Sequence, residues 1–323
     1  MSKYIIGIDI GGTTIKLGII SSNGELFHKW SIPTNTENQG SFIINDIWES
    51  IVIKIKSENM INEDINGIGV GIPGYIDTNS GIVYEAINIG WKNINIKQEL
   101  EKISGLPVHI ENDANIAVLG ENWQGAGNQA KHVIAVTLGT GVGGGIITNG
   151  EILNGRNGMA GELGHILIEE NGAHCNCGNR GCLETIASAT GIVRQAMIKI
   201  KENPNSLLAN IYNEDQVITS KAVFELAEQG NQEAVDIIAY TSYVLAQTFA
   251  NLGVILNPEK ILIGGGVSKA GQPLLDRITD TFKEIALPNV VRACEIKLAQ
   301  LGNDAGIIGA AYLVKQNEEE ISF

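Results

Sequence analysis

Cysteine is scarce in this chain, and its hydrophobic segments are short. The 323 residues include four cysteines, three of which lie between positions 175 and 182. No apolar run approaches the roughly 20 residues that a helix needs to cross a bilayer, and Asp9 with a glycine pair stands where a signal peptide would be apolar. The sequence therefore predicts a soluble, cytoplasmic protein with no membrane partner. In a reducing compartment, clustered cysteines favour a metal site over disulfides.

Basic residues are also few. The chain has 22 Lys and Arg against 36 Asp and Glu, which gives a formal net charge of -14. Nucleic acid is a polyanion that requires clustered Lys and Arg, so the charge balance argues against a nucleic-acid partner. At roughly 150 residues per domain, the length predicts two domains, each large enough to bury a core. Glycine, in contrast, is abundant, because 39 residues are about 12% of the chain where about 7% is ordinary.

Much of this glycine lies in two similar segments. A strand expected at Tyr4–Ile8 is followed by the turn Gly11–Thr14 and a second strand, Ile15–Ile20. A strand expected at Val133–Val136 is likewise followed by Gly139–Gly145 and an apolar stretch, 126 to 128 residues further along the chain. The repeat indicates a duplication with one glycine-rich strand-turn-strand in each half.

Glycine-rich turns of this kind can hold phosphate, because backbone amides approach an anion closely where no Cβ intervenes. A plain hairpin turn is the alternative for either segment, but two copies at matching places favour phosphate binding. Gly12 is followed by Thr13 and not by the Lys of a P-loop. Gly139–Gly144 matches a dinucleotide fingerprint, but that motif must open a helix, and Ile146–Thr148 reads as a strand.

The remaining pattern mixes strands with helices, which predicts an α/β architecture. Helices are expected near residues 41–57, 185–203, 219–229, 232–253 and 304–316, and further strands near 67–71, 108–110 and 260–263.

Asp113 follows the strand expected at Val108–Ile110, within Glu111-Asn112-Asp113-Ala114-Asn115. A carboxylate at the end of a strand can accept the proton of a sugar hydroxyl as its oxygen attacks phosphorus, which accelerates such reactions roughly 100- to 10,000-fold. Asp113 could equally be the N-cap of the helix that follows. Its position alone leaves both interpretations open.

One histidine and three cysteines form a second constellation. His165 in Gly-Glu-Leu-Gly-His is followed by Cys175, Cys177 and Cys182. One His and three Cys complete a tetrahedral zinc shell with no open position for water, so the metal is expected to be structural. Free thiols in a loop are the alternative, with Cys294 a buried, inert cysteine. Glu184 lies two residues after Cys182, on the same segment.

Taken together, these motifs resemble the ROK family (repressor, open reading frame, kinase) of sugar kinases, and its bacterial glucokinases in particular. The strings that carry the resemblance are DIGGTTIKLG from Asp9, GIPGYID from Gly71, ENDAN from Glu111, VTLGTGVGGG from Val136, GELGH from Gly161, CNCGNRGCLETIASATG from Cys175 and IGGGVS from Ile263. They cover the chain from its first strand to about residue 268, and the cysteine string is the most specific.

The resemblance implies the actin-like ATPase (ribonuclease H-like) fold, with two duplicated α/β domains and a cleft between them. The N-terminal α/β domain would span 1–115 and be completed by the C-terminal helix at about 304–323. The C-terminal α/β domain, with the zinc knuckle, would span 116–303.

The resemblance also implies roles for individual residues. Asp113 corresponds to the catalytic base. The sugar contacts fall on Gly74, Asn88, Asn112, Asp113, Glu162, His165 and Glu184. The structural zinc ligands fall on His165, Cys175, Cys177 and Cys182. ATP is expected against Asp9, Gly11, Gly12, Thr13, Thr14, Lys16, Gly139, Thr140, Gly141, Gly265 and Gly266, with Asp9 helping to hold Mg²⁺ through water. His165 would bind zinc with one ring nitrogen and meet a sugar hydroxyl with the other.

The function implied is ATP-dependent phosphorylation of the primary hydroxyl of glucose by a homodimer or homotetramer. Another hexose, N-acetylmannosamine or fructose, is the alternative substrate. A sugar-sensing repressor of the same family is disfavoured. Its helix-turn-helix needs roughly 60 to 80 residues before the phosphate loop, whereas the loop motif begins here at Asp9, and the net charge disfavours DNA binding. An inactive sugar-binding module is disfavoured by Asp113 and by the two phosphate loops.

Overall fold

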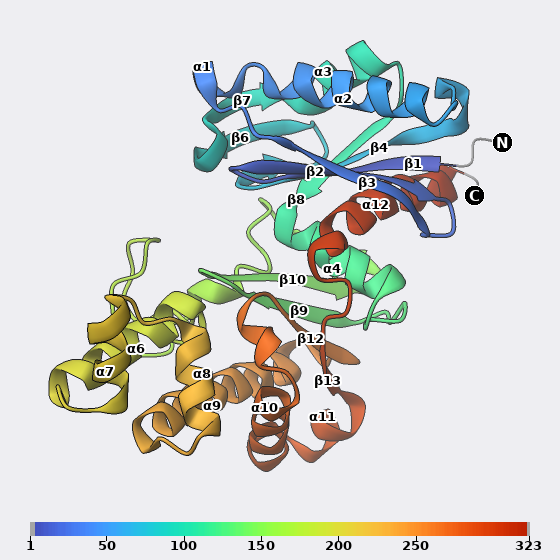
Figure 1. Cartoon of the computed structure of the whole chain (residues 1–323). Helices are drawn as coiled ribbons and strands as arrows, with labels where there is room; N and C mark the ends of the chain where they lie inside the picture. The colour runs from blue at the N-terminus through green and yellow to red at the C-terminus, as the bar shows by residue number, and fades with distance from the viewer. Residues whose placement is uncertain (1–3, 322–323) are drawn as a thin grey trace. The chain divides into compact units, whose positions relative to one another are not determined.

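The computed structural model of the protein describes residues 4–321, with the side chains up to Glu318, and divides the chain into two compact units (Figure 1). Unit 1 comprises Met1–Gln129, Ile146–Ala160 and Leu301–Phe323, and unit 2 comprises Ala130–Gly145 and Gly161–Gln300. Residues 1–3 and 322–323, which the predicted N-terminal domain includes, lie outside the described residues.

Unit 1 is built on a five-stranded mixed sheet with the order β3-β2-β1-β4-β8. Its strands are β1 (Tyr4–Ile10), β2 (Thr14–Ser21), β3 (Leu26–Pro33), β4 (Ile65–Ile72) and β8 (Val108–Asn112). The central strand β1 pairs antiparallel with β2 and parallel with β4, and β4 pairs parallel with β8. Apolar residues fill both faces of β1 and β4, so helices must cover both faces of the sheet.

One face of this sheet is covered by α2 (Ile43–Ser57) and α3 (Ile96–Ser104), and the other by α4 (Asp113–Gln124) and α12 (Ala305–Ile321) (Figure 1). In α2, isoleucines at helical spacing are buried in the core of the unit, among them Ile47, Ile51 and Ile55. Unit 1 also contains a short helix, α1 (Glu37–Gly40), and a small antiparallel sheet of β5 (Tyr75–Asp77), β6 (Ile82–Ala86) and β7 (Trp91–Asn95).

The helix α12 lies in backbone contact with its neighbours. A Cβ on Gly69 of β4 would lie 1.7 Å from the carbonyl oxygen of Ala310, and a Cβ on Gly309 would lie 1.7 Å from the carbonyl oxygen of Ile116 in α4. Both separations are far too short for any side chain. Glycine is therefore required here for close packing.

A second five-stranded mixed sheet has the order β11-β10-β9-β12-β13. Its strands are β9 (Val133–Leu138), β10 (Val142–Thr148), β11 (Glu151–Ile152), β12 (Lys260–Gly264) and β13 (Glu295–Leu298). The helices of unit 2 are α5 (Glu184–Ala187), α6 (Ala189–Glu202), α7 (Leu207–Asp215), α8 (Ser220–Glu228), α9 (Gln232–Leu256), α10 (Gln272–Ile285) and α11 (Pro288–Ala293). Side chains of Ser188, Ser206, Thr219 and Asn231 cap the N-termini of α6 to α9.

The two sheets have the same order of strands: third, second, first, fourth and fifth along the segments that form them. Each glycine-rich turn joins the first strand to the second, as a duplication of the chain predicts.

The division of the chain differs from the predicted boundary at residue 115. That boundary would cut α4 near its beginning, whereas α4 belongs wholly to unit 1 because it packs along α12. Residues 146–160 also belong to unit 1. Among the described residues, no helix has both the length and the apolar character needed to cross a membrane.

Candidate active site and metal site

Asp113 is the first residue of α4, directly after β8 ends at Asn112. The side-chain oxygen of Asn112 accepts hydrogen bonds from the backbone N–H groups of Ala114 (2.9 Å) and Asn115 (3.4 Å). Asn112 is thus the N-cap, and the alternative assignment of that role to Asp113 is wrong. The Asp113 carboxylate is partly exposed and accepts the Ala114 N–H at 2.9 Å. The N-terminus of α4 favours negative charge at this position, and the Asp113 carboxylate is accessible from solvent.

The junction of β8 and α4, at Asn112 and Asp113, is called the corner of Asp113. A cavity of about 300 Å³ within unit 1 adjoins this corner. Gly74 and Asn112, both predicted sugar contacts, line it, and the Asn112 amide donates to the Gly74 carbonyl oxygen at 3.4 Å. Gly74 has φ +108, and a Cβ there would lie 2.3 Å from the carbonyl oxygen of Glu85, so only glycine fits. The cavity is polar, with Glu111 and Asn154 among its lining residues. Its size and polarity suit a small hydroxylated molecule.

Asn88, a further predicted sugar contact, lies beside the first glycine-rich loop. Its Cβ is 3.3 Å from the place that a Cβ on Gly12 would occupy. Asn88 does not line the cavity of Gly74 and Asn112. Of the four predicted sugar contacts in unit 1, Gly74 and Asn112 therefore line this cavity, Asp113 directly follows Asn112, and Asn88 lies at the first glycine-rich loop.

The first predicted phosphate loop, Gly11–Thr14, joins β1 to β2. Its ends are tied by the Gly11 N–H, which donates to the Thr14 carbonyl at 3.1 Å, and by Thr34, whose hydroxyl donates to the Gly11 carbonyl at 2.6 Å. The residues from Gly12 to Thr14 are exposed, so they remain accessible to an anion. Next to the loop, the Lys16 ammonium lies 3.3 Å from the Asp9 carboxylate across the two paired strands.

The second predicted phosphate loop, Gly139–Gly141, belongs to unit 2 and joins β9 to β10. The chain continues from it as a strand, which confirms that its glycines do not open the helix of a dinucleotide fingerprint. Gly139, Thr140 and Gly266 line one cavity of about 810 Å³. Gly265 has φ +86 and forms the turn after β12, where a Cβ would lie 2.5 Å from the Leu138 carbonyl.

Charged and aromatic side chains also line this larger cavity: Lys221, Phe224, Glu225 and Glu228 on α8, and Lys269 after β12. The ring of Phe224 and the size of the cavity suit a flat ligand, while the ammonium of Lys221 is paired with Glu225 at 3.4 Å. Sequence reasoning missed them because none belongs to a motif. The only signal in the sequence was the amphipathic character of the helix predicted at 219–229, which carries Lys221 and Phe224.

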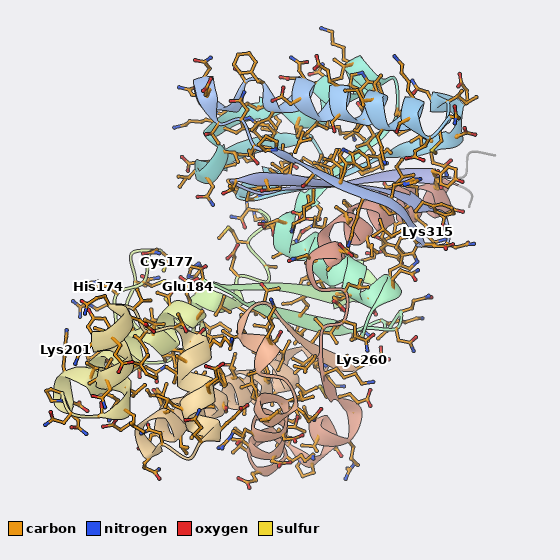
Figure 2. The ribbon with its side chains drawn as sticks, in the orientation of Figure 1. His174, Cys177, Glu184, Lys201, Lys260 and Lys315 are labelled. Atoms are coloured by element: carbon orange, nitrogen blue, oxygen red, sulfur yellow. The ribbon has the colours of Figure 1, made fainter. Side chains whose placement is uncertain are left out.

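Glu184, which is labelled in Figure 2, is the first residue of α5 and reaches the end of the second phosphate loop. Its carboxylate accepts the backbone N–H of Val142 at 3.0 Å, and a Cβ on Gly141 would lie 2.2 Å from the same oxygen. The N–H of Ala189 donates to the Gly139 carbonyl at 2.8 Å, so the segment from α5 to α6 holds the loop at two points. In the described conformation, Glu184 is therefore bonded to the loop that was predicted to bind phosphate, although it was predicted as a sugar contact.

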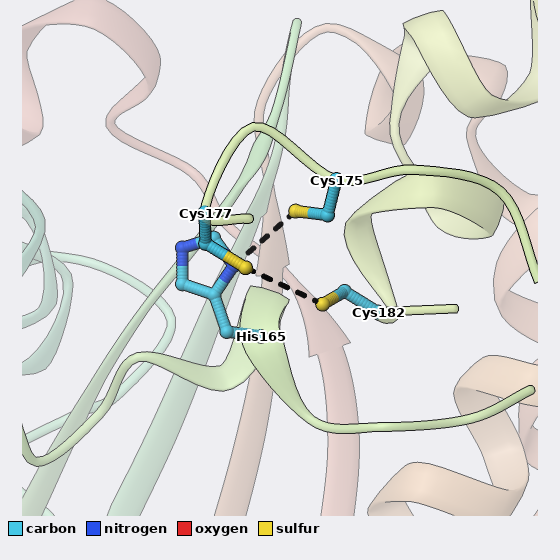
Figure 3. Close-up of side chains that lie close together, drawn as sticks. All are labelled: His165, Cys175, Cys177 and Cys182. Atoms are coloured by element: carbon cyan, nitrogen blue, oxygen red, sulfur yellow. Dashed lines mark hydrogen bonds between the residues drawn. The ribbon is translucent and has the colours of Figure 1, made fainter. Parts of the chain in front are cut away.

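The predicted zinc ligands converge (Figure 3). One ligand atom from each of His165, Cys175, Cys177 and Cys182 lies within 4.8 Å of all the others. The Sγ atoms of Cys177 and Cys182 are 3.7 Å apart, and Nδ1 of His165 is 3.6 Å from Sγ of Cys175. The four residues come from a 3-10 turn, Leu163–His165, and from the turns that precede α5.

These separations fit a tetrahedral zinc ion. Zn–S bonds of about 2.3 Å and Zn–N bonds of about 2.0–2.1 Å place tetrahedral ligand atoms roughly 3.5–3.8 Å apart. Without a cation, burial raises the pKa of Cys182 to about 12 and also raises the pKa of Cys175. A bound cation favours the thiolates by compensating this burial. The cluster is thus a metal site such as one for zinc.

The second nitrogen of His165 points away from the sulfur atoms. Nε2 lies 3.9 Å from the carboxylate of Glu162, which is exposed. Nδ1 therefore faces the metal site, and Nε2 and Glu162 form a polar pair beside it. This geometry allows the two roles that were predicted for the ring.

The remaining cysteine and the other histidines lie outside the metal cluster. Cys294 is buried, and burial raises the pKa of its thiol to about 12. His28 lies 3.2 Å from the Glu58 carboxylate, and His174 lies close to the guanidinium of Arg180. Burial lowers the pKa of His109.

Comparison with known proteins adds to this geometry. The family model described as ROK family matches residues 5–317. A curated glucokinase of Halalkalibacterium halodurans is 48% identical over 320 residues, which cover 99% of this chain and 97% of that protein.

Two solved structures are similar over nearly their whole length. A ROK hexokinase from Thermus thermophilus has a TM-score of 0.82 at 27% identity, covering 98% of this chain and 99% of that one. A ROK family glucokinase from Streptomyces griseus, solved in complex with glucose and AMPPNP, has a TM-score of 0.75 at 35% identity, covering 97% of this chain and 99% of that one.

Proposed function

This chain belongs to the ROK family, and we propose that it is a glucokinase that transfers the γ-phosphoryl group of ATP to the primary hydroxyl of glucose. The products are glucose 6-phosphate and ADP. Its two mixed five-stranded sheets have the actin-like ATPase fold of the ROK hexokinases. The observation that carries the proposal is the 48% identity to a glucokinase across 99% of this chain.

Asp113 is the general base of the proposed reaction. It accepts the proton of the glucose hydroxyl as that oxygen bonds to phosphorus and the bond to the leaving ADP oxygen breaks. The support is its position at the start of α4, where the helix favours its charge and where the cavity of Gly74 and Asn112 adjoins it. Asn112 holds the corner as the N-cap.

The other predicted sugar contacts are proposed on the resemblance and on their chemistry. Glu162 and the Nε2 atom of His165 offer an acceptor and a ring nitrogen side by side, which suits neighbouring sugar hydroxyls. Gly74 and Asn88 are proposed as contacts of the same ligand. Glu184 would need to turn at least one carboxylate oxygen away from its present partners, the Val142 N–H and the Cys175 thiol, to reach a hydroxyl.

For ATP, we propose phosphate binding at the two glycine-rich loops, and adenosine binding in the cavity lined by Gly266. The residues assigned to the phosphates are Asp9, Gly11, Gly12, Thr13, Thr14, Lys16, Gly139, Thr140 and Gly141, and those assigned to the adenosine are Gly265 and Gly266. Bound Mg²⁺ neutralises phosphate charge. Asp9 is the carboxylate that would hold it, which fits the preference of Mg²⁺ for one or two carboxylates together with water and phosphate oxygens.

His165, Cys175, Cys177 and Cys182 are proposed to hold a structural zinc ion. Four protein ligands leave no open position, so zinc would orient the His165 ring without taking part in phosphoryl transfer. We further propose that the protein works in the cytoplasm, where ATP is available, and as a dimer or tetramer, which light scattering can test.

The base assignment is tested with Asp113→Asn. We expect kcat for glucose phosphorylation to fall about 100- to 10,000-fold, because the amide cannot accept the proton. Glucose binding, measured by calorimetry, should persist because the amide is nearly isosteric. Asp236→Asn, at an exposed carboxylate on α9, is the control and should keep full activity.

A coupled assay for glucose 6-phosphate with glucose, mannose, fructose and N-acetylmannosamine tests the substrate. We expect the highest kcat/KM for glucose. Full activity of Asp113→Asn would refute the role of the base, and a preference for N-acetylmannosamine or fructose would refute the substrate.

A further inference from the structure

A carboxyl group is buried directly beside the proposed catalytic base. Glu111 is the next-to-last residue of β8 and is 4% exposed. Burial raises the pKa of this carboxyl group. Burying a carboxylate is unfavourable unless hydrogen bonds replace the lost water, so the partners of Glu111 determine what it contributes.

These partners come from two distant segments of the chain. Oε1 of Glu111 accepts the backbone N–H of Asn112 at 2.8 Å and the amide of Asn115 at 3.0 Å. Oε2 accepts the amide of Asn154, which lies 43 residues further along the chain, at 3.0 Å. The amide of Asn115 also donates to the side-chain oxygen of Asn154 at 3.1 Å. The side chains of Glu111, Asn115 and Asn154 therefore form a closed hydrogen-bonded network.

This network holds Asp113 from both sides. The residue before Asp113 is bonded to Glu111 through its backbone, and Asn115, two residues after it, is bonded through its buried side chain. Asn112 in turn caps α4 and lines the 300 Å³ cavity. A rotation of the corner that carries Asp113 would break at least one bond to Glu111.

The same carboxylate holds a wall of that cavity. Asn154 begins the cavity loop, residues 154–158, which lines the cavity together with Glu111 and Asn112. The Asn154 carbonyl accepts the N–H of Ala160 at 3.3 Å, so the far end of the loop closes back on the same residue.

We infer that Glu111 is a positioning residue, which fixes the corner of Asp113 and the cavity loop relative to each other. The inference rests on the proposed function, since it gives Glu111 a task within the same reaction. Glu111 does not take a proton from glucose. It keeps the acceptor oxygen of Asp113 at a constant place beside the cavity that receives the sugar.

A second buried carboxyl group offers a matched control. Glu121, also 4% exposed, lies on α4 and accepts the backbone N–H groups of Ala126 at 3.2 Å and Leu301 at 2.6 Å. Neither partner lines the cavity. Glu111→Gln and Glu121→Gln therefore both replace a buried carboxyl group that accepts bonds from N–H donors, but only the first alters the cavity.

In Glu111→Gln, the new NH₂ group must face one of the N–H donors, so the network loses a bond while the side chain keeps its shape. We expect kcat for glucose to fall about 10- to 100-fold, the range expected when a reacting group is misplaced by up to 1 Å. The KM for ATP should stay within about twofold, because the phosphate loops are not touched. Glu121→Gln should lose a similar amount of stability and keep kcat within about twofold.

Hydrogen exchange of the unliganded protein provides a readout that does not depend on catalysis. In Glu111→Gln, the amides of residues 112–116 and 154–160 should exchange faster together, and in Glu121→Gln they should not. Asn154→Ala removes one arm of the network and is the second variant if Glu111→Gln does not fold. It should speed exchange in both segments and reduce kcat less.

If the wild-type protein does not phosphorylate glucose, the proposed function fails, while the exchange measurement still decides the role of Glu111. Equal losses of kcat in Glu111→Gln and Glu121→Gln, or faster exchange in only one of the two segments, overturn the inference.

Discussion

Gly309→Ala tests how the C-terminal helix positions the proposed catalytic corner. Gly309 lies on α12 where this helix crosses α4, and Asp113 is the first residue of α4. The contact is reciprocal, because a Cβ on Gly120 of α4 would lie 2.1 Å from the carbonyl oxygen of Ala305 in α12. The added methyl group at position 309 would therefore push the two helices apart.

The size of the effect follows from the geometry. The new Cβ would lie 1.7 Å from the Ile116 carbonyl oxygen and must reach at least 3.0 Å, so the backbones must separate by about 1.3 Å. The clash joins a main-chain carbonyl oxygen and a Cβ atom, and no side-chain torsion moves either atom, so no change of rotamer relieves it. We expect a loss of about 3 kcal/mol, the upper end of typical overpacking costs. The shift of α4 should also reduce kcat, because Asp113 moves with it.

Urea unfolding followed by circular dichroism measures the stability, and the coupled kinase assay measures kcat. Gly230→Ala is the control: Gly230 has φ +83 and no atom within 4 Å of a new Cβ, so it reports backbone strain without a clash. That strain costs roughly 1–2 kcal/mol. A change below about 0.5 kcal/mol in Gly309→Ala, the size expected of a neutral surface substitution, would refute the close-packing argument.

Two further predictions concern the cysteines. In Cys177→Ser, elemental analysis should find no bound zinc, the protein should be destabilised by at least about 2 kcal/mol, and glucose binding should weaken. The control variant Cys294→Ala should retain zinc. If Cys177→Ser lacks the metal but melts at an unchanged temperature, the structural role of zinc is ruled out. Burial raises the pKa of Cys294 from 9.0 to about 12, so its thiol favours folding below pH 9 and loses that contribution as the pH rises towards 12. At pH 9, iodoacetamide should therefore modify Cys294 at least about 100-fold more slowly in the folded protein than in urea, which mass spectrometry measures; equal rates would contradict its burial.

Several features could be predicted from the sequence because each is encoded within a few residues. The cluster of metal-binding side chains is one of them. Three cysteines within eight positions and a histidine shortly before them can reach a common centre by local turns alone. The two glycine-rich hairpins are another, since a strand, a turn and a strand form between neighbours in sequence. The strand order of the two sheets agrees with the duplication that these hairpins indicate.

Other features depend on residues that are distant in sequence, and no local sequence pattern predicts them. The bond between Glu111 and Asn154 joins positions 43 residues apart, and Phe224 and Gly266 line one cavity only because α8 lies near the turn after β12. The limit of unit 1 is decided in the same way, because α4 joins that unit by backbone contact with Gly309. Local geometry, which can be inferred from neighbouring residues, thus accounts for the His and Cys cluster and for the two repeated hairpins. Tertiary structure alone decided which side chains hold Asp113 in place, because that depends on the packing of distant segments.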